Sequence, residues 1–369
     1  MTLLVSAGEG SGDAMAAPVV RALGGPAFGL GGRALAAAGA ELSVDLASVT
    51  GMGIGAVLAK APAIARAARR LLVEARERRA RAALLVGYSE FNAWLGPRLR
   101  ELGVRVLWYA PPQIWAWRAG RAPGLRRAVD RMAVVLPFEE ALWRNHGVDA
   151  HFVGHPSLER SQVPRDAVRQ RLGLTPWAEY VALLPGSRPH EVRRHLGPML
   201  DALALLRAER GALDARVVVA PALGPSDAAW ATRRAHASGV GVIESSAPAV
   251  LPAFDVALAA SGTVTLECVA AEVPPVIGYR AGAVTELVAR RMLSVDHIGL
   301  PNLVLGERVF PELVQASFTA EHLAEQAGKL LDERARFVRA CRDVRATLAP
   351  AAEPAPSAHV ARLVAPWLK

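Results

Sequence analysis

The stretch LLPGSRPHEVRRHL, residues 183–196, places Gly186, Ser187 and Arg188 between an apolar run and a basic amphipathic pattern. Free backbone N–H groups and the positive end of a helix dipole favour an anion at such a helix start. The guanidinium of Arg188 can also bind two phosphate oxygens at once. An ordinary strand–turn–helix with a solvated arginine explains the same letters, and the Walker pattern of ATPases is absent. The stretch predicts either a phosphate-binding loop or a simple turn.

A second glycine loop, ASGTVTLE at 260–267, also follows an apolar run. Ser261 and Thr263 can cap a helix or bind phosphate, and Glu267 lies about one turn further along. A capping box accounts for the same residues without any ligand. Two such loops in one half of the chain favour a nucleoside diphosphate as the ligand.

A third glycine cluster, SAGEGSGD at 6–13, combines small residues with two acids. Its spacing is not that of a dinucleotide fingerprint, and no acid follows a strand about 20 residues later to bind a ribose. Glu9 and Asp13 are instead candidate site carboxylates, although Asp13 can equally cap a helix. The loop itself consists of Gly8, Gly10, Ser11 and Gly12.

The stretch YAPPQIWAW, residues 109–117, gathers a tyrosine and two tryptophans around a few polar groups. An apolar aromatic surface with a few polar groups, here from Gln113 and Trp115, suits a sugar or a lipid. The alternative is that these aromatic side chains pack in the protein core. No Asp-x-Asp pair and no His/Cys/carboxylate spacing typical of a metal site occurs in the sequence. Helix ends and arginines are therefore expected to stabilise a leaving diphosphate without a metal ion or other cofactor.

A long helical pattern at 53–72, GIGAVLAKAPAIARAARRLL, combines apolar and basic residues. Such a helix can rest on an anionic membrane, and it can equally pack on a sheet with its charges in water. The residues expected to contact a membrane are Ile54, Val57, Leu58, Arg66, Arg69 and Arg70.

The motifs follow apolar runs that alternate with helical patterns. Candidate strands lie at 1–7, 81–87, 104–110 and 131–138 in the first half, and at 180–186, 215–223, 239–245, 254–262 and 274–280 in the second. Near-continuous apolar strands separated by helices predict parallel sheets covered on both faces. The predicted fold class is α/β, with two doubly wound Rossmann-like domains facing a cleft. Each glycine cluster falls at the carboxyl end of a strand, where such folds bind ligands.

A linker-like stretch, HFVGHPSLERSQVP, separates the two halves. The expected domains are 1–160 and 161–345. A tail at 346–369 begins rich in proline and alanine and ends in a helical pattern, which can cross back onto the first domain.

Composition sets broad limits on partners and compartment. The chain has 369 residues, is 52% hydrophobic and carries a net charge of +9, which permits an anionic partner without identifying one. The basic residues are dispersed and no recognition motif is present, which disfavours nucleic acid. Cys268 and Cys341 form no disulfide framework. No run is long and apolar enough for a membrane span, and the N-terminus lacks a signal-peptide pattern, so a reducing cytoplasm is expected.

In this order, the clusters resemble the lipid-A-disaccharide synthase family over residues 5 to about 325. The matching stretches are AGEGSGD, FGLGG, MGIGAVL, YAPPQIWAWR, LPFEEALWRNHGV, FVGHP, LLPGSR, ASGTVTLE, GYR, GLPNL and PELVQ. The resemblance implies a two-domain glycosyltransferase of GT-B type, inverting and metal-independent. It implies transfer of 2,3-diacylglucosamine from UDP to the 6-hydroxyl of 2,3-diacylglucosamine 1-phosphate, at the inner face of the cytoplasmic membrane.

The same resemblance assigns residues to the donor side. They are Gly186, Ser187, Arg188, Ser261, Gly262, Thr263, Glu267, Tyr279, Arg280, Asn302, Glu312 and Gln315. On the acceptor side the sequence departs from the family, because GYSEFN at 87–92 stands where members typically have GIDAPDFN. The family's candidate base, the first Asp of that motif, is missing, so the base is expected to be Glu90, Glu9 or Asp13.

Three alternatives stay open. The chain can be a diverged relative that uses another UDP-sugar and another acceptor. It can be an enzyme similar to UDP-N-acetylglucosamine 2-epimerase, which shares a two-domain fold, or a binding protein that has lost its base. The oligomeric state stays open, with a homodimer as one possibility.

Overall fold

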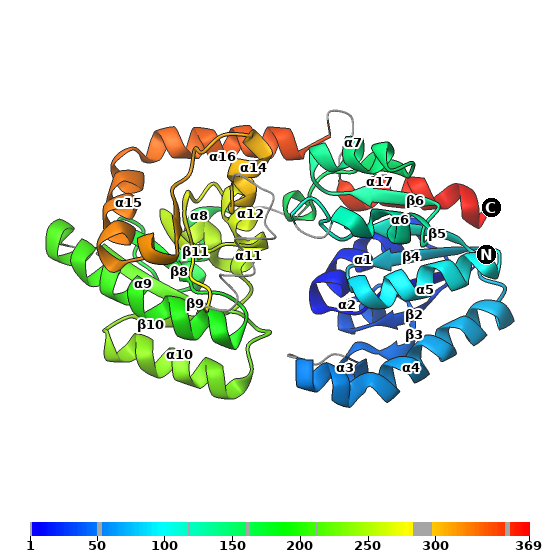
Figure 1. The fold of residues 1–369 in the computed structure, drawn as a ribbon. Helices are drawn as coiled ribbons and strands as arrows, with labels where there is room; N and C mark the ends of the chain where they lie inside the picture. Colours follow the sequence, from blue (N-terminus) through cyan, green and yellow to red (C-terminus); the bar gives the residue numbers. More distant parts are fainter. Residues whose placement is uncertain are drawn as a thin grey trace. The chain divides into compact units, whose positions relative to one another are not determined.

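The structure is a computed structural model that describes residues 2–49, 54–116, 119–159, 163–211, 213–282, 297–350 and 355–369, without the side chains of 49, 54–60 and 119. The chain divides into two compact units. Unit 1 comprises Met1–Glu159 with Leu348–Lys369, and unit 2 comprises Arg160–Thr347. Figure 1 shows that each unit has its own central sheet flanked by helices, which confirms the predicted fold class.

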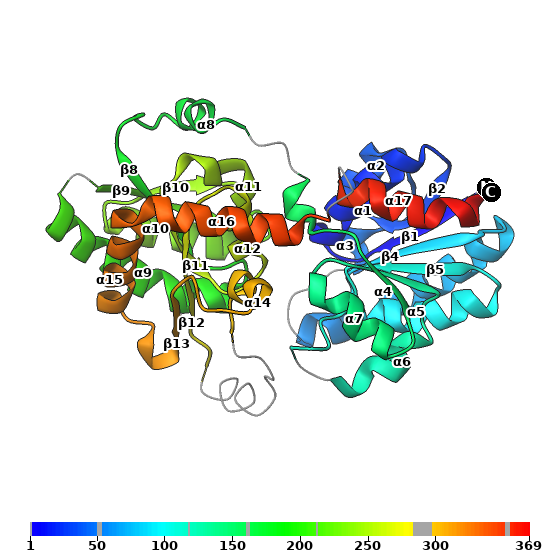
Figure 2. The same cartoon turned by 90° about the horizontal axis from the view of Figure 1, so that it is seen from above.

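Unit 1 is built on a seven-stranded parallel sheet with the order β3-β2-β1-β4-β5-β6-β7. The strands are β1 (Leu3–Ala7), β2 (Ala27–Gly31), β3 (Glu41–Asp45), β4 (Ala82–Val86), β5 (Arg105–Tyr109), β6 (Arg131–Val134) and β7 (Asp149–Phe152). At the centre, β1 pairs with β4, with Leu3 opposite Ala82. Both strands are buried along their whole length because helices cover both faces of the sheet (Figure 2).

The helices of unit 1 include one from the far end of the chain. They are α1 (Gly10–Leu23), α2 (Arg33–Ala37), α3 (Leu46–Val49), α4 (Ile54–Glu77), α5 (Ser89–Glu101), α6 (Ala122–Arg126), α7 (Pro137–Asn145) and α17 (Pro356–Val364). Helix α17 packs beside α1 (Figure 2). Arg131 donates to the Leu363 carbonyl at 2.9 Å, and Arg105 and Arg131 lie 5.3 Å and 5.1 Å from the Trp367 ring centroid. The last residues of the chain thus complete unit 1.

Unit 2 contains a six-stranded parallel sheet with the order β10-β9-β8-β11-β12-β13. The strands are β8 (Glu179–Leu184), β9 (Leu213–Val219), β10 (Gly241–Glu244), β11 (Val256–Ala260), β12 (Pro275–Tyr279) and β13 (Glu312–Val314). The described helices are α8 (Arg165–Arg171), α9 (Pro189–Arg210), α10 (Pro225–Ala237), α11 (Ala247–Val250), α12 (Thr263–Ala270), α14 (Leu300–Leu305), α15 (Ala320–Asp332) and α16 (Arg334–Leu348).

Strand order reverses once in each sheet. In unit 1 the reversal lies between β1 and β4, and in unit 2 it lies between β8 and β11. Open α/β sheets bind ligands at the carboxyl ends of the strands that flank such a point. The loops that follow these four strands carry the GEGSGD, GYSEFN, LPGSR and SGT motifs.

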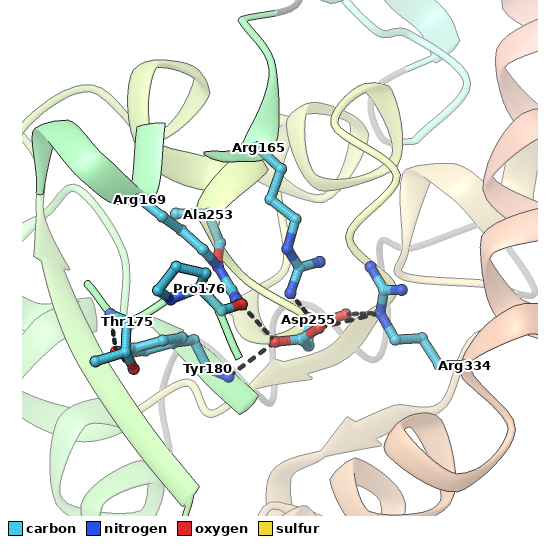
Figure 3. A network of polar contacts seen from close by, with 8 residues as sticks. All are labelled: Arg165, Arg169, Thr175, Pro176, Tyr180, Ala253, Asp255 and Arg334. Carbon is cyan, nitrogen blue, oxygen red and sulfur yellow. Dashed lines mark hydrogen bonds and ion pairs between the residues drawn. The ribbon is translucent and has the colours of Figure 1, made fainter. Parts of the chain in front are cut away.

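A network of arginines surrounds Asp255 at the amino-terminal edge of the unit 2 sheet (Figure 3). Asp255 is buried just before β11 and accepts from the Tyr180 amide at 2.9 Å. Arg165 and Arg169 of α8 pair with its carboxylate, and Arg334 of α16 lies 3.4 Å from it. Because α8 opens unit 2 and α16 closes it, one carboxylate connects both ends of this unit to the middle of its sheet.

Candidate functional site

The LPGSR loop joins β8 to α9, and its backbone turns at Gly186 with a φ of 126°. A Cβ atom at this position would lie 2.6 Å from Glu191, so the turn requires glycine. Glu191 accepts from the amides of Ser187 and Arg188, each at 3.2 Å, and also pairs with the Arg188 guanidinium at 3.0 Å. These amides were expected to be free, and the structure corrects that expectation because a carboxylate already satisfies them. The Arg188 side chain is 65% exposed.

The SGT loop joins β11 to α12, and here the start of the helix is open. Gly262 has a φ of 152° and, as the N-cap residue of α12, has no side chain with which to cap it. The Thr265 hydroxyl bonds back to the Gly262 carbonyl at 2.8 Å, and the Ser261 hydroxyl donates to the Ile298 carbonyl at 2.6 Å. A carboxylate that reaches back to a helix start is found on α9 instead, where Glu191 accepts from the Ser187 and Arg188 amides. Exposed Thr263 opens the helix, and half-buried Glu267 lies one turn along it.

Tyr279, Arg280 and Gln315 lie at the carboxyl ends of β12 and β13. The Arg280 amide donates to His195 at 3.0 Å, and the Tyr279 ring lies edge-on to the same histidine at 5.3 Å between centroids. Burial raises the pKa of Tyr279, so its hydroxyl keeps its proton. Gln315 has a left-handed φ of 54° and accepts from the Ala281 amide at 3.2 Å. A non-glycine residue in this region is strained, and such strain often marks a functional site.

Asn302 and Glu312 are buried and bonded to one another. The Asn302 amide donates to Glu312 at 2.8 Å, and its oxygen accepts from the amides of Val309 and Phe310. Glu312 also accepts from the Gly299 amide at 3.0 Å. Donor contact by these two residues stays a prediction, and their observed bonds position the 298–302 segment.

The donor-side loops are brought together by the strand order. β8, β11, β12 and β13 are consecutive neighbours, so the loops that follow them meet at one edge of the sheet. In unit 1, the loops after β1 and β4 meet in the same way. A Cβ atom at Gly8 would lie 1.9 Å from the Tyr88 ring, and one at Gly12 would lie 3.2 Å from the Val86 carbonyl. These glycines therefore allow the two loops to touch, while Gly10 and Ser11 are exposed.

The three candidate bases have different surroundings. Glu9 is exposed at the amino end of α1. Asp13 is buried and accepts from the amides of Gly32, Ala34 and Leu35 at 2.7 Å, 2.9 Å and 3.1 Å. The contacts of Asp13 are those of a carboxylate that caps α2, rather than its own helix.

Glu90, in the first turn of α5, is exposed and pairs with Arg121 through both oxygens at 2.9 Å. Next to it, fully buried Asn92 accepts from the Ser6 hydroxyl at 2.7 Å and donates to the Gly87 carbonyl at 2.8 Å. Asn92 was not singled out in the sequence. The letters GYSEFN show its position in the motif but not its partner on β1, 86 residues away.

The aromatic loop after β5 is anchored by a second residue that the sequence did not single out, Glu139. The Trp115 indole donates to Glu139 at 2.8 Å, and its ring lies edge-on to Phe138 at 5.2 Å. Glu139 is 1% exposed, and burial raises its pKa to about 7. Gln113 is exposed, and Trp117 lies outside the described residues.

Helix α4 turns its basic residues to solvent. Arg66, Arg69 and Arg70 are exposed, whereas Ala67, Ala68 and Leu71 between and beside them are buried against the sheet. The side chains of Ile54, Val57 and Leu58 are outside the described part of the chain.

In the ranges described above, no helix is long and apolar enough to cross a bilayer. The same ranges contain no group of three or more His, Cys, Asp and Glu side chains that could hold a metal ion.

Comparison with solved structures defines the class. The S. aureus MnaA–UDP co-structure superimposes with a TM-score of 0.67 at 11% identity, covering 100% of this chain and 96% of that one. The glycosyltransferase SnogD from Streptomyces nogalater gives 0.54 at 18% identity, covering 99% of each chain. At such low identity the likeness shows the fold alone. It is the two-domain GT-B fold, which glycosyltransferases share with UDP-GlcNAc 2-epimerases.

Sequence comparison identifies the family within that class. The family model for lipid-A-disaccharide synthetase matches residues 3–358. Lipid-A-disaccharide synthase of Myxococcus xanthus is 43% identical over 337 residues, covering 89% of this chain and 87% of the relative. The synthase of Anaeromyxobacter dehalogenans strain 2CP-1 is 40% identical over 360 residues, covering 94% and 93%. The chain belongs to the lipid-A-disaccharide synthase family, which confirms the resemblance found in its motifs.

Proposed function

We propose that this protein transfers 2,3-diacylglucosamine from UDP to the 6-hydroxyl of 2,3-diacylglucosamine 1-phosphate, with inversion at the anomeric carbon. The products are the β-1,6 disaccharide 1-phosphate and UDP. The observation that carries the proposal is the family match along residues 3–358, which favours transfer over epimerisation. The donor-side loops on four neighbouring strands support it independently.

The donor diphosphate is proposed to bind at the amino end of α12, between Arg188 and Arg280. The N-cap residue of this helix, Gly262, has no side chain, whereas Glu191 occupies the start of α9. As the bond to the diphosphate breaks, negative charge grows on its oxygens, and preorganised N–H groups and guanidiniums stabilise that charge. The UDP in the MnaA co-structure supports a uridine diphosphate ligand for this fold.

The acceptor is assigned to unit 1, where its hydroxyl loses a proton to a carboxylate during attack. Of the three candidates, the contacts favour Glu9. Its carboxylate makes no hydrogen bond within the described ranges, whereas Arg121 holds Glu90 and three amides hold Asp13. Asp13 is proposed to position α2.

A product assay tests the proposal. Both acylated substrates are supplied in detergent micelles with EDTA, and products are identified by mass spectrometry. The tetraacyl disaccharide 1-phosphate and UDP should form together. UDP binding without disaccharide formation would contradict the proposed identity of the acceptor. Conversion of UDP-N-acetylglucosamine without any acceptor would indicate the epimerase alternative.

A further inference from the structure

A buried histidine bridges two loops of the donor side that do not adjoin each other in the sheet. His195 lies in the second turn of α9 and has no exposed surface. Its Nδ1 lies 2.8 Å from the Pro185 carbonyl, and its Nε2 lies 3.0 Å from the Arg280 amide. Pro185 begins the loop that carries Arg188.

The partners of His195 determine its protonation. The Pro185 carbonyl can only accept, so Nδ1 carries the hydrogen, and the Arg280 amide can only donate, so Nε2 is the acceptor. The ring is therefore neutral, because a second proton on Nε2 would point at the N–H of the Arg280 amide, which is also a donor. Burial lowers the pKa of His195, which acts in the same direction.

The two loops bridged by His195 follow β8 and β12, which are separated by β11. Neighbouring strands lie about 4.8 Å apart, so the two strands that carry these loops are roughly 10 Å apart. The loop between them is the open start of α12. The connection continues on the far side of β12, where Gln315 accepts from the Ala281 amide at 3.2 Å.

The packing around the ring leaves little freedom to shift. Tyr279 and Phe318 contact it edge-on, with centroids 5.3 Å and 5.2 Å away. An apolar side chain of similar size could fill this space, but it could not hold either loop. Both polar atoms of the buried ring are bonded to backbone: Nε2 to Arg280 itself, and Nδ1 to Pro185, three residues before Arg188.

We propose that His195 is a positioning residue for the UDP-sugar: it sets the separation of the Arg188 and Arg280 loops so that both arginines reach one diphosphate. The inference rests on the proposed function and deepens it. His195 does not contact the reacting atoms, so its effect should fall on donor binding and spare acceptor binding.

Three substitutions separate the two bonds. His195→Asn can keep the bond to the Pro185 carbonyl, His195→Gln can keep the bond to the Arg280 amide, and His195→Leu keeps neither. The expected KM for the UDP-sugar rises up to about tenfold for each single loss and further for His195→Leu. The KM for the acceptor should stay at the wild-type value, with kcat changing less than the donor KM.

Leu203→Ala serves as the matched control, because Leu203 is buried on the same helix two turns away and makes no polar contact to the loops. It should lower the melting temperature without raising the donor KM. His195→Leu with a wild-type donor KM, or with a change no larger than that of Leu203→Ala, would overturn the inference. Failure of the wild-type enzyme to bind UDP or form disaccharide would instead count against the proposed function.

Discussion

At the residue scale, the chemistry depends on which carboxylates are already engaged. Asp13 uses its oxygens on three amides of α2, and Glu90 is held by Arg121. Glu9 is exposed at the start of α1, beside the Tyr88 ring that packs on Gly8. A general base must accept a proton from the hydroxyl that attacks, and the proposal assigns this role to Glu9 because the other two carboxylates already accept hydrogen bonds.

Replacing Glu9 with glutamine should lower kcat by about 10²–10⁴-fold, because the amide cannot accept the proton. The KM for the UDP-sugar should be unchanged, since Glu9 belongs to unit 1. Glu90→Gln is the paired variant and should lower turnover less. The measurement is steady-state disaccharide formation for both variants. Full activity in Glu9→Gln together with loss in Glu90→Gln would move the base to Glu90.

Glu139 should make stability depend on pH. Its folded pKa of about 7 exceeds the ordinary value of 4.5 because burial disfavours the charged form. The stabilisation is therefore complete below about pH 4.5 and is lost as pH rises through 7, by on the order of 3 kcal/mol. Urea unfolding should show the wild type losing this stability relative to Glu139→Gln between pH 5 and pH 8. Glu101→Gln, an exposed control on α5, should follow the wild type, and parallel curves for all three proteins would refute the assignment.

At the element scale, two helices of unit 2, α9 and α12, begin at the same edge of the sheet. The start of α9 is occupied by a carboxylate, whereas α12 starts at a glycine. At the start of α9, the Glu191 carboxylate reaches back and accepts from the Ser187 and Arg188 amides. The N-cap residue of α12 is Gly262, which has no side chain to occupy the start of the helix. A helix start holds one anion well, and this is why the donor diphosphate is proposed to bind at the start of α12.

Thr263→Glu should separate stability from binding. A carboxylate in the first turn of α12 should stabilise the helix by about 0.3–1 kcal/mol through its dipole. The same carboxylate should compete with the diphosphate and weaken UDP binding at least about tenfold, since it adds charge where charge must enter. Calorimetric titration with UDP measures the second effect, with Thr263→Gln as the uncharged control. Equal UDP affinity in the two variants would place the diphosphate elsewhere.

Helix α4 is proposed to bind an anionic membrane through Arg66, Arg69 and Arg70. Each arginine near such a surface contributes about 1 kcal/mol, so changing all three to glutamine should weaken vesicle binding about 100-fold. Co-sedimentation with phosphatidylglycerol vesicles is the measurement. The matched control removes the same charge from exposed Arg336, Arg339 and Arg342 of α16. An equal loss of vesicle binding in both triple variants would show that binding depends on the net charge of the protein and not on α4.

The elements that could be predicted from sequence are those with long apolar runs. β4, β5, β8 and β11 fall where five or more apolar residues follow one another. β2, β3 and β7 were missed because AFGLG contains two glycines and the other two strands carry charged residues. Glu191, at the third position of α9, is the residue type and spacing that let a carboxylate reach back to the Ser187 and Arg188 amides.

At the scale of the whole molecule, adjacency of loops was predictable and individual partners were not. Parallel strands guarantee that their carboxyl ends share an edge, so LPGSR and SGT had to be close. The bond from Arg280 to His195 joins positions 85 residues apart, and the periodic pattern of apolar residues in the sequence does not predict such a bond. The same holds for Asp255, whose three arginine partners come from both ends of unit 2.

Asp255→Asn should destabilise unit 2 as a whole, by about 3–5 kcal/mol, because it leaves buried positive charge without its partner. Helices α8 and α16 lose a common attachment, so their amides should exchange with deuterium faster than those of unit 1. Hydrogen exchange with mass spectrometry reports this by segment. Asp332→Asn removes an exposed ion pair with Arg210 and should change little. Uniform loss of protection in both units would show that the network is not specific to unit 2.

The attachment of α17 to α1 has a consequence for synthesis on the ribosome. Residues 160–347 form one uninterrupted stretch of chain, and no later segment is needed to complete their unit. Residues 1–159 emerge earlier but lack the segment from Leu348 onward that packs on them. Domains usually fold in the order of their emergence. In this chain the unit that is translated first is the last to be completed, and a stalled or truncated nascent chain would leave the flank of α1 uncovered.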